Sequence, residues 1–165
     1  MTTVAGALAE ARARGVASLD AQLLLARVLA VTRSALIAGA EHQLSRAEEQ
    51  RWTAWRDRRA AGEPLAYLLG EKEFHGLLLE VTPDVLVPRP ETELLVEWAS
   101  SLLAPFVAAR TGRGGAPRVV DLGTGSGAIA LALKRLCPQA EIVATDASAA
   151  ALAVARRNAE RHGLA

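Results

Sequence analysis

The fold of this chain is decided by the stretch Val119-Val120-Asp121-Leu122-Gly123-Thr124-Gly125-Ser126-Gly127-Ala128-Ile129-Ala130. Two β-branched residues lead into an aspartate, glycine then occupies every second position, and an apolar pattern with helical spacing follows. This order predicts a strand, a glycine loop and the start of a helix. Glycine lets a ligand approach main-chain N–H groups, and the free N–H groups of the first helical turn point to the same place. The stretch therefore predicts a cradle for a nucleotide-type cofactor.

A second acidic residue is predicted beside this cradle. Residues 141–145 read as another strand, Asp146 follows it, and Ser148 is placed to cap a further helix, which completes a βαβα unit. Ligands of such sheets bind at the carboxyl ends of the strands. Asp146 lies about twenty residues past the loop, where an acid often binds ribose hydroxyls, and a helix cap is its alternative role.

Two classes of cofactor fit the glycine loop. The loop satisfies a loose Gly-x-Gly-x-x-Ala pattern through Gly123, Gly125 and Ala128, which would suit a dinucleotide. Asp121, directly before the loop, would repel a pyrophosphate but would attract the amino group and sulfonium of S-adenosylmethionine. We therefore favour S-adenosylmethionine and rank a nicotinamide oxidoreductase last.

Composition sets broad limits on the class of protein. The 165 residues suffice for one ordinary domain or two small ones, and 51% hydrophobic with 22% charged residues indicates a globular chain. A net charge of +1 gives no overall attraction to nucleic acid or membrane. Cys137 is the single cysteine, the first residues show no secretory pattern, and no apolar run approaches the ~18 residues of a membrane span, so a cytoplasmic location is expected.

The first part of the chain, to about residue 61, predicts a small helical bundle. Thr3, Thr32 and Ser45 are placed as N-caps, and Ser45 with Glu48 forms a capping box. A second helix is expected to open at Ser18, and a last short helix to run from Pro64 to Leu69. Short loops between the helices favour an antiparallel bundle.

Two clusters on the longest of these helices admit more than one interpretation. Trp52 and Trp55 lie three residues apart on one face, and we favour core packing over a partner-binding surface. Arg56, Arg58 and Arg59 form a basic cluster, which we interpret as a solvated face rather than a docking surface for an acidic or RNA-rich partner.

A hairpin and a loop framed by prolines follow the bundle. Glu71–Phe74 and Leu77–Val81 read as two strands joined by a turn at His75-Gly76. Pro88 and Pro90 should hold Arg89 extended, while Glu91, Thr92 and Glu93 enter the first turn of a helix. This segment is either a rigid linker or a functional loop. The helix is expected to bury Leu94, Leu95, Trp98 and Leu102 and to give way to a surface connection from Pro105 to Pro117.

Four stretches together closely resemble the PrmC/HemK family of release-factor glutamine methyltransferases. The glycine loop alone indicates a class I methyltransferase, and the Pro-Arg-Pro-Glu-Thr-Glu sequence points to this family. The resemblance extends from about Gly62 to Ala165, and the helical front half fits the family's N-terminal domain in size and type. The stretches are Gly62-Glu63-Pro64-Leu65-Ala66-Tyr67-Leu68-Leu69-Gly70, Phe74-His75-Gly76, Val85-Leu86-Val87-Pro88-Arg89-Pro90-Glu91-Thr92-Glu93 and Asp121-Leu122-Gly123-Thr124-Gly125-Ser126-Gly127.

The resemblance implies an activity and a domain order. The family transfers a methyl group from S-adenosylmethionine to the side-chain amide nitrogen of the glutamine in a release factor's Gly-Gly-Gln motif. By this resemblance, residues 1–70 form an α-helical bundle that docks the release factor, and residues 71–90 form the hairpin and the linker framed by prolines. Residues 91–165 then form the first, βαβα part of an α/β Rossmann-like methyltransferase domain.

The resemblance also assigns site residues. Arg89, Pro90, Glu91 and Thr92 would wall the cofactor and glutamine pocket, Asp121 would orient the cofactor's amino group, and Asp146 would bind the ribose hydroxyls. The whole cofactor set is Asp121, Gly123, Thr124, Gly125, Ser126, Gly127 and Asp146. No metal ligand, membrane contact or direct contact with nucleic acid is expected.

One family motif does not occur in these residues. The family positions the glutamine amide with an Asn-Pro-Pro-Tyr motif after its fourth strand, and that motif is absent from the 165 residues. We therefore assign no catalytic residue and expect the chain to be an inactive N-terminal portion of a longer enzyme. The alternatives are a partner-binding module with a vestigial cofactor fold, or a methyltransferase of another amide or of RNA.

Overall fold

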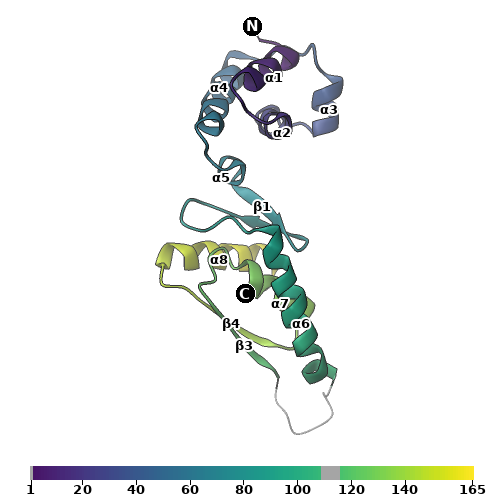
Figure 1. The fold of residues 1–165 in the computed structure, drawn as a ribbon, viewed down its shortest axis with the longest axis vertical. Helices are drawn as coiled ribbons and strands as arrows, with labels where there is room; N and C mark the ends of the chain where they lie inside the picture. The colour runs from purple at the N-terminus through teal and green to yellow at the C-terminus, as the bar shows by residue number, and fades with distance from the viewer. Residues whose placement is uncertain (1, 109–115) are drawn as a thin grey trace. The chain divides into compact units, whose positions relative to one another are not determined.

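The computed structural model describes residues 2–108 and 116–165, and these form two compact units. Unit 1 spans Met1–Leu69 and unit 2 spans Gly70–Ala165 (Figure 1). Within the described ranges, no helix has both the length and the apolar character needed to cross a membrane.

Unit 1 is built from helices whose ends are set by local capping. The side chains of Thr3, Thr32 and Ser45 each accept a hydrogen bond from an N–H three residues later, and Glu48 completes the predicted capping box. The second helix begins at Ser18 as predicted, although Ala17 holds the cap position and no side chain caps it. The helices are α1 (Val4–Ala13), α2 (Ser18–Leu29), α3 (Arg33–Ala38), α4 (Arg46–Ala60) and α5 (Leu65–Leu69).

The core of unit 1 forms where α1, α2 and α4 meet. Trp52 is fully buried against apolar side chains of the first two helices, and Trp55 packs against the same cluster while remaining partly exposed. The prediction that both tryptophans serve core packing is confirmed. Burial of two large aromatic side chains supplies much of the hydrophobic stabilisation available to a unit of this size.

The basic cluster on α4 is not the solvated face that the sequence suggested. The Arg56 side chain is only 6% exposed, and its guanidinium donates to Glu10 of α1 at 2.8 Å and to Asp57 at 3.0 Å. Arg59 donates to Asp20 of α2 at 2.8 Å. The aliphatic stem of an arginine can lie in a core while its head reaches an acid on a neighbouring helix. Two of the arginines therefore fasten α4 to α1 and α2.

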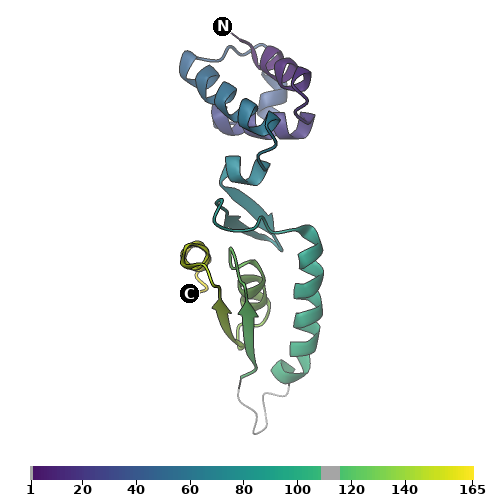
Figure 2. The same cartoon turned by 60° about the vertical axis from the view of Figure 1, so that its left-hand side comes forward.

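Unit 2 contains two small sheets with helices packed against them. The turn of the hairpin places His75 and Gly76 in the left-handed region, with φ of 49° and 75°, as a type I′ turn requires. The second sheet pairs two strands in parallel, as Figure 2 shows, with Arg118 opposite Glu141 and Leu122 opposite Thr145. The elements are β1 (Glu71–Phe74), β2 (Leu77–Glu80), η1 (Pro90–Thr92), α6 (Glu93–Ala108), β3 (Arg118–Leu122), α7 (Ala128–Leu136), β4 (Glu141–Thr145) and α8 (Ala149–His162).

The parallel sheet is covered on one of its faces. Val119 and Ile142, which are register partners, point toward the helices and pack against the core of unit 2. Val120, Leu122 and Val143 alternate to the opposite face and are exposed. The order of strand, helix, strand and helix confirms the predicted partial Rossmann-like fold.

The prediction for the buried face of α6 is wrong. Val96 is completely buried and Leu103 packs beside it, whereas Leu94 and Trp98, which were expected inside, are 66% and 62% exposed. The helix is apolar on both sides, so spacing alone could not select the face that meets α7. Leu95 and Leu102, also expected inside, are likewise exposed.

The helix α6 also continues through Pro105 to Ala108 rather than ending before the proline. Residues 109–115 of the expected connection lie outside the described residues.

The buried position of Arg56 leads to a testable difference in stability. We expect Arg56→Ala to lower the free energy of unfolding of unit 1 by about 1–3 kcal/mol, because it removes a buried stem and charge-assisted hydrogen bonds. Arg51→Ala, at an exposed position on the same helix, should change it by less than about 0.5 kcal/mol. Urea denaturation followed by the fluorescence of Trp52 and Trp55, in a Trp98→Phe background, measures both, and equal effects would contradict this role of Arg56.

Candidate functional site

Main-chain hydrogen bonds tie the glycine loop to the end of the neighbouring strand. The N–H groups of Gly123 and Thr124 both donate to the carbonyl oxygen of Thr145, each at 2.9 Å. In return, the hydroxyl of Thr145 donates to the carbonyl oxygen of Asp121 at 3.1 Å. The carboxyl ends of β3 and β4 are therefore locked together, and the loop leaves from this joint.

Asp121 is oriented by the loop that follows it. Its Oδ2 accepts a hydrogen bond of 2.7 Å from the hydroxyl of Thr124, which is itself buried. A carboxylate has about four acceptor positions, so this bond fixes the group while leaving it able to accept from a ligand. Asp121 thus presents a held negative charge at the start of the loop.

Asp146 holds the loop from the other strand. Its Oδ2 accepts from the N–H of Gly125 at 2.9 Å, and its Oδ1 accepts from the N–H of Ser148 at 2.9 Å. The N–H groups of Ser148 and Gly125 favour the charged form and hold the pKa of the Asp146 carboxyl below its ordinary value. The side-chain cap of α8 is supplied by Ser148, whose hydroxyl accepts from Ala151. Asp146 therefore orders the loop and is no simple helix cap.

The glycines of the loop serve two different needs. Gly125 has a φ of +56°, and a Cβ added there would meet nothing within 4 Å, so the main chain borders open space that a side chain would occupy. Gly127 has a φ of +83°, and a Cβ would lie 3.1 Å from Leu131 and 3.3 Å from Ala155. The earlier glycine leaves the main chain of the loop uncovered, and the later one lets the loop approach α8.

The helix after the loop adds hydrogen-bond donors to this cradle. α7 begins at Ala128, its cap position is Gly127, and no side-chain cap accepts from the first N–H groups of this described helix. Held carboxylates on two strand ends, beside open main chain and helix N–H groups, suit a ligand with a positively charged group and vicinal hydroxyls. These residues fit S-adenosylmethionine. Among the described residues, no cluster of histidine, cysteine and acidic side chains could hold a metal ion.

The structure places the predicted acceptor residues on a separate segment. Arg89 is extended, with φ −97° and ψ 145°, as its flanking prolines predicted. Pro90 and Glu91 are exposed, and the N–H of Thr92 donates to the carbonyl oxygen of Arg89 at 3.0 Å. Among the described residues, no hydrogen bond or ion pair is recorded between this segment and the glycine loop. The structure thus joins Asp121, the loop and Asp146, and does not join Arg89–Thr92 to them.

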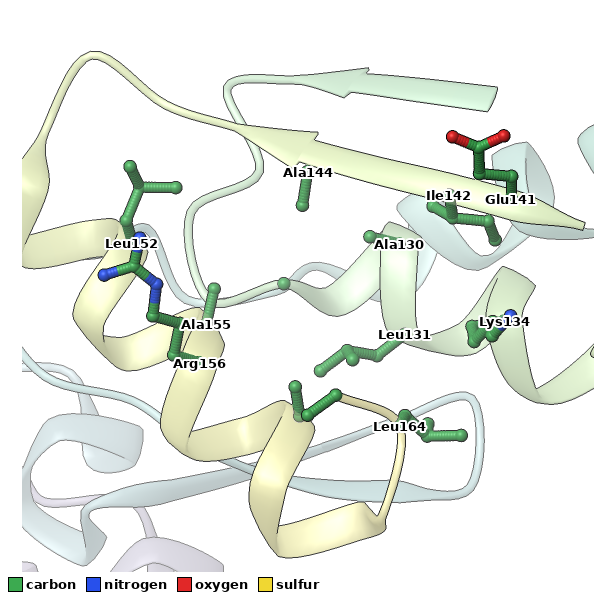
Figure 3. A pocket seen from close by; sticks show the side chains of 13 residues that line it. Ala130, Leu131, Lys134, Glu141, Ile142, Ala144, Leu152, Ala155, Arg156 and Leu164 are labelled. Carbon is green, nitrogen blue, oxygen red and sulfur yellow. The ribbon is translucent and has the colours of Figure 1, made fainter. Parts of the chain in front are cut away.

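A cavity of about 400 Å³ lies next to the loop but outside the cradle. Figure 3 shows it between β4 and the helices α7 and α8, with Leu131, Ala144 and Leu152 among its labelled apolar residues. Asp121 and Asp146 do not line it. Lys134 at its rim donates to the carbonyl oxygens of Pro138 and Ala140. Its charged lining residues are Lys134, Glu141 and Arg156, so the two aspartates at the strand ends belong to a different place on the sheet edge.

One residue that contacts the loop was missed by the sequence analysis. Asn158 of α8 is fully buried, and its side-chain amide donates to the carbonyl oxygen of Ser126 in the loop at 2.9 Å. A signal was present in the sequence, because Asn158 falls on the apolar face of its helix with Val154 and Ala155. A polar residue on a buried face needs partners, and here the loop supplies one of them.

Comparisons with protein families match most of the chain. The model of the "PrmC N-terminal domain" matches residues 2–70, and the model of the "Methyltransferase small domain" matches residues 95–165. The first covers the helical unit, and the second covers the glycine loop with both aspartates. Similarity to a methyltransferase domain implies use of a methyl donor.

Several curated relatives share one name. The chain is 52% identical over 149 residues to the release factor glutamine methyltransferase of Bordetella pertussis, covering 90% of this chain and 52% of the relative. It is 48% identical over 150 residues to that of Burkholderia pseudomallei, covering 91% and 50%. For Coxiella burnetii the identity is 49% over 144 residues, with 87% and 49% covered. The chain spans about half the length of the curated relatives it matches.

The contacts of Asp146 predict its titration. A carboxyl with a depressed pKa stabilises the folded loop above its unfolded pKa, and this contribution is lost as the pH falls through the folded value. We expect the carboxyl carbon of Asp146 to titrate below the midpoint of an aspartate in an unfolded peptide, and the amide proton of Gly125 to move with the same midpoint. An NMR titration measures both, and a midpoint at or above the peptide value would contradict the assignment.

Proposed function

Since the chain belongs to the PrmC/HemK family of release factor glutamine methyltransferases, we propose that it forms the docking domain and half of the cofactor site of such an enzyme. The activity is methylation of the side-chain amide nitrogen of the glutamine in the Gly-Gly-Gln motif of peptide chain release factors, in the cytoplasm. The observation that supports it most is the glycine loop held between Asp121 and Asp146.

The methyl donor in this proposal is S-adenosylmethionine, which when bound supplies an electrophilic methyl group on a sulfonium. Asp121 orients the amino group of the donor, since its carboxylate is already fixed by Thr124. Asp146 accepts from the ribose hydroxyls with lone pairs that Gly125 and Ser148 do not use. Gly123, Thr124, Gly125, Ser126 and Gly127 supply the main chain on which the donor lies.

The acceptor side of the proposal rests on the segment framed by prolines. An amide nitrogen is a poor nucleophile, so the enzyme must align it with the methyl group and exclude water. Arg89, Pro90, Glu91 and Thr92 form a stiff and mostly exposed wall that offers both donors and acceptors to a glutamine side chain. Residues 1–70 dock the release factor in this proposal, and residues 71–90 connect that docking domain to the methyltransferase part.

The activity can be tested directly. We expect the gene product that contains these residues to transfer label from S-adenosylmethionine to the glutamine of the Gly-Gly-Gln motif when it is mixed with a release factor. Peptide mass spectrometry locates the label, and a release factor with that glutamine replaced by alanine serves as the control. Label on another residue or on RNA, or no label with intact binding of the release factor, would contradict the proposal.

The role of Asp146 in cofactor binding can be tested by substitution. Asp146→Ala should weaken the binding of S-adenosylmethionine by about tenfold or more, because charge-assisted hydrogen bonds to the ligand and to the loop are lost together. Glu141→Gln is a matched control, since this exposed acid lies at the opposite end of the same strand. Calorimetry measures both affinities, and an unchanged affinity in Asp146→Ala would count against the ribose role.

A further inference from the structure

We propose that Asn158 is a positioning residue that holds the glycine loop in place and fastens it to the hairpin. The side chain is fully buried in α8 and forms three hydrogen bonds, all with main-chain groups. The proposal rests on the proposed function, because the loop is taken as the cofactor cradle.

The hydrogen bonds of Asn158 use both N–H donors and the oxygen of its carboxamide. Its Nδ2 donates to the carbonyl oxygen of Ser126 at 2.9 Å and to the carbonyl oxygen of Glu80 at 3.0 Å. Its Oδ1 accepts from the N–H of Glu80 at 2.7 Å. Two donors and an acceptor on one short side chain occur in asparagine, whereas aspartate lacks the donors and glutamine is longer by a methylene.

The hydrogen bond from Asn158 to the carbonyl oxygen of Ser126 fixes one side of the peptide unit that joins Ser126 to Gly127. The N–H of Gly127 belongs to the same plane and donates to the carbonyl oxygen of Thr124 at 2.9 Å. Because the peptide unit is rigid, two bonds on opposite sides leave the plane no freedom to rotate. Loss of Asn158 would remove the hydrogen bond on the carbonyl side of this peptide unit. The carbonyl oxygen of Ser126, at the base of the cradle, would then lack its buried donor.

Three consecutive residues of the loop are thereby held by Asp146, which follows β4, and by α8. Asp146 bonds to Gly125, Asn158 bonds to Ser126, and Gly127 packs against Ala155 of α8. The N–H groups of the first turn of α7 follow directly after these residues. The direction in which those N–H groups point thus depends on Asn158, although its recorded hydrogen bonds all lie within the protein.

The two bonds to Glu80 connect the loop with the hairpin. Glu80 is the last residue of β2, and the chain then runs on to the segment framed by prolines. Arg157 binds the carboxylate of the same Glu80 at 2.7 Å, and His162 contacts the carbonyl oxygen of Leu78 at 3.0 Å. The groups that Arg157 and His162 contact here lie in the hairpin, whereas the side chain of Asn158 also bonds to the loop. Asn158 therefore couples the cradle to the strand that precedes the acceptor segment.

Paired variants of the gene product that contains this chain separate positioning from plain stability. Asn158→Asp removes the donors at nearly constant volume, and Arg157→Gln removes a contact between the same helix and the same Glu80 without touching the loop. We expect Asn158→Asp to weaken binding of S-adenosylmethionine by roughly tenfold or more at a temperature well below unfolding, and Arg157→Gln to bind as the wild type does. Equal affinities in the two variants and the wild type would overturn the proposal.

Amide exchange gives a second readout that needs no cofactor. The Gly127 amide should exchange roughly tenfold faster in Asn158→Asp than in Arg157→Gln, relative to amides in the middle of α8. A uniform rise over all amides would show a general loss of stability and would overturn the positioning role. If the wild type does not bind S-adenosylmethionine, the proposed function fails, and the exchange of Gly127 alone decides whether Asn158 orders the loop.

If Asn158→Asp does not fold, the wild-type spectrum decides the positioning role. The side-chain NH₂ signals of Asn158 should exchange slowly with water and should shift when S-adenosylmethionine is added to saturation. Fast exchange of these protons, or signals that stay unchanged at saturation, would overturn the proposal.

Discussion

The hydrogen bond from the Gly125 N–H to the Asp146 carboxylate is the interaction on which the site depends. It ties the loop after one parallel strand to the acid after the other, and it places a fixed negative charge beside main chain that no side chain covers. Thr124 orients Asp121 in the same way at the start of the loop. The glycine loop is thus preorganised by its own acids, so little ordering is left for a ligand to impose.

The parts of the fold that depend on local chemistry could be predicted from the sequence. Thr3 and Ser45 cap their helices through groups three residues away, and in the turn at His75-Gly76 the N–H of Gly76 donates to the carboxylate of Glu73, also three residues away. The glycine loop belongs to the same class, because a strand, its loop and the next helix are consecutive in the chain. The assignments of Asp121 and Asp146 to a ligand remain predictions, since their recorded contacts are within the protein.

The parts that could not be predicted depend on partners far away in the sequence. Arg56 resembles a surface residue until Glu10, 46 residues earlier, is known to face it. The helix α6 is apolar on two sides, and only the packing of α7 selects the side with Val96. Asn158 meets Glu80 across 78 residues, so its sequence position could reveal a buried polar group but not the loop that it holds.

We propose that the cradle between Asp121 and Asp146 binds S-adenosylmethionine and no dinucleotide. Isothermal calorimetry of the gene product that contains this chain, with S-adenosylmethionine and NAD⁺ in parallel titrations, tests this most directly. We expect saturable binding of S-adenosylmethionine that is lost in Asp121→Ala, and no measurable heat from NAD⁺. Binding of NAD⁺ with no binding of S-adenosylmethionine would contradict it.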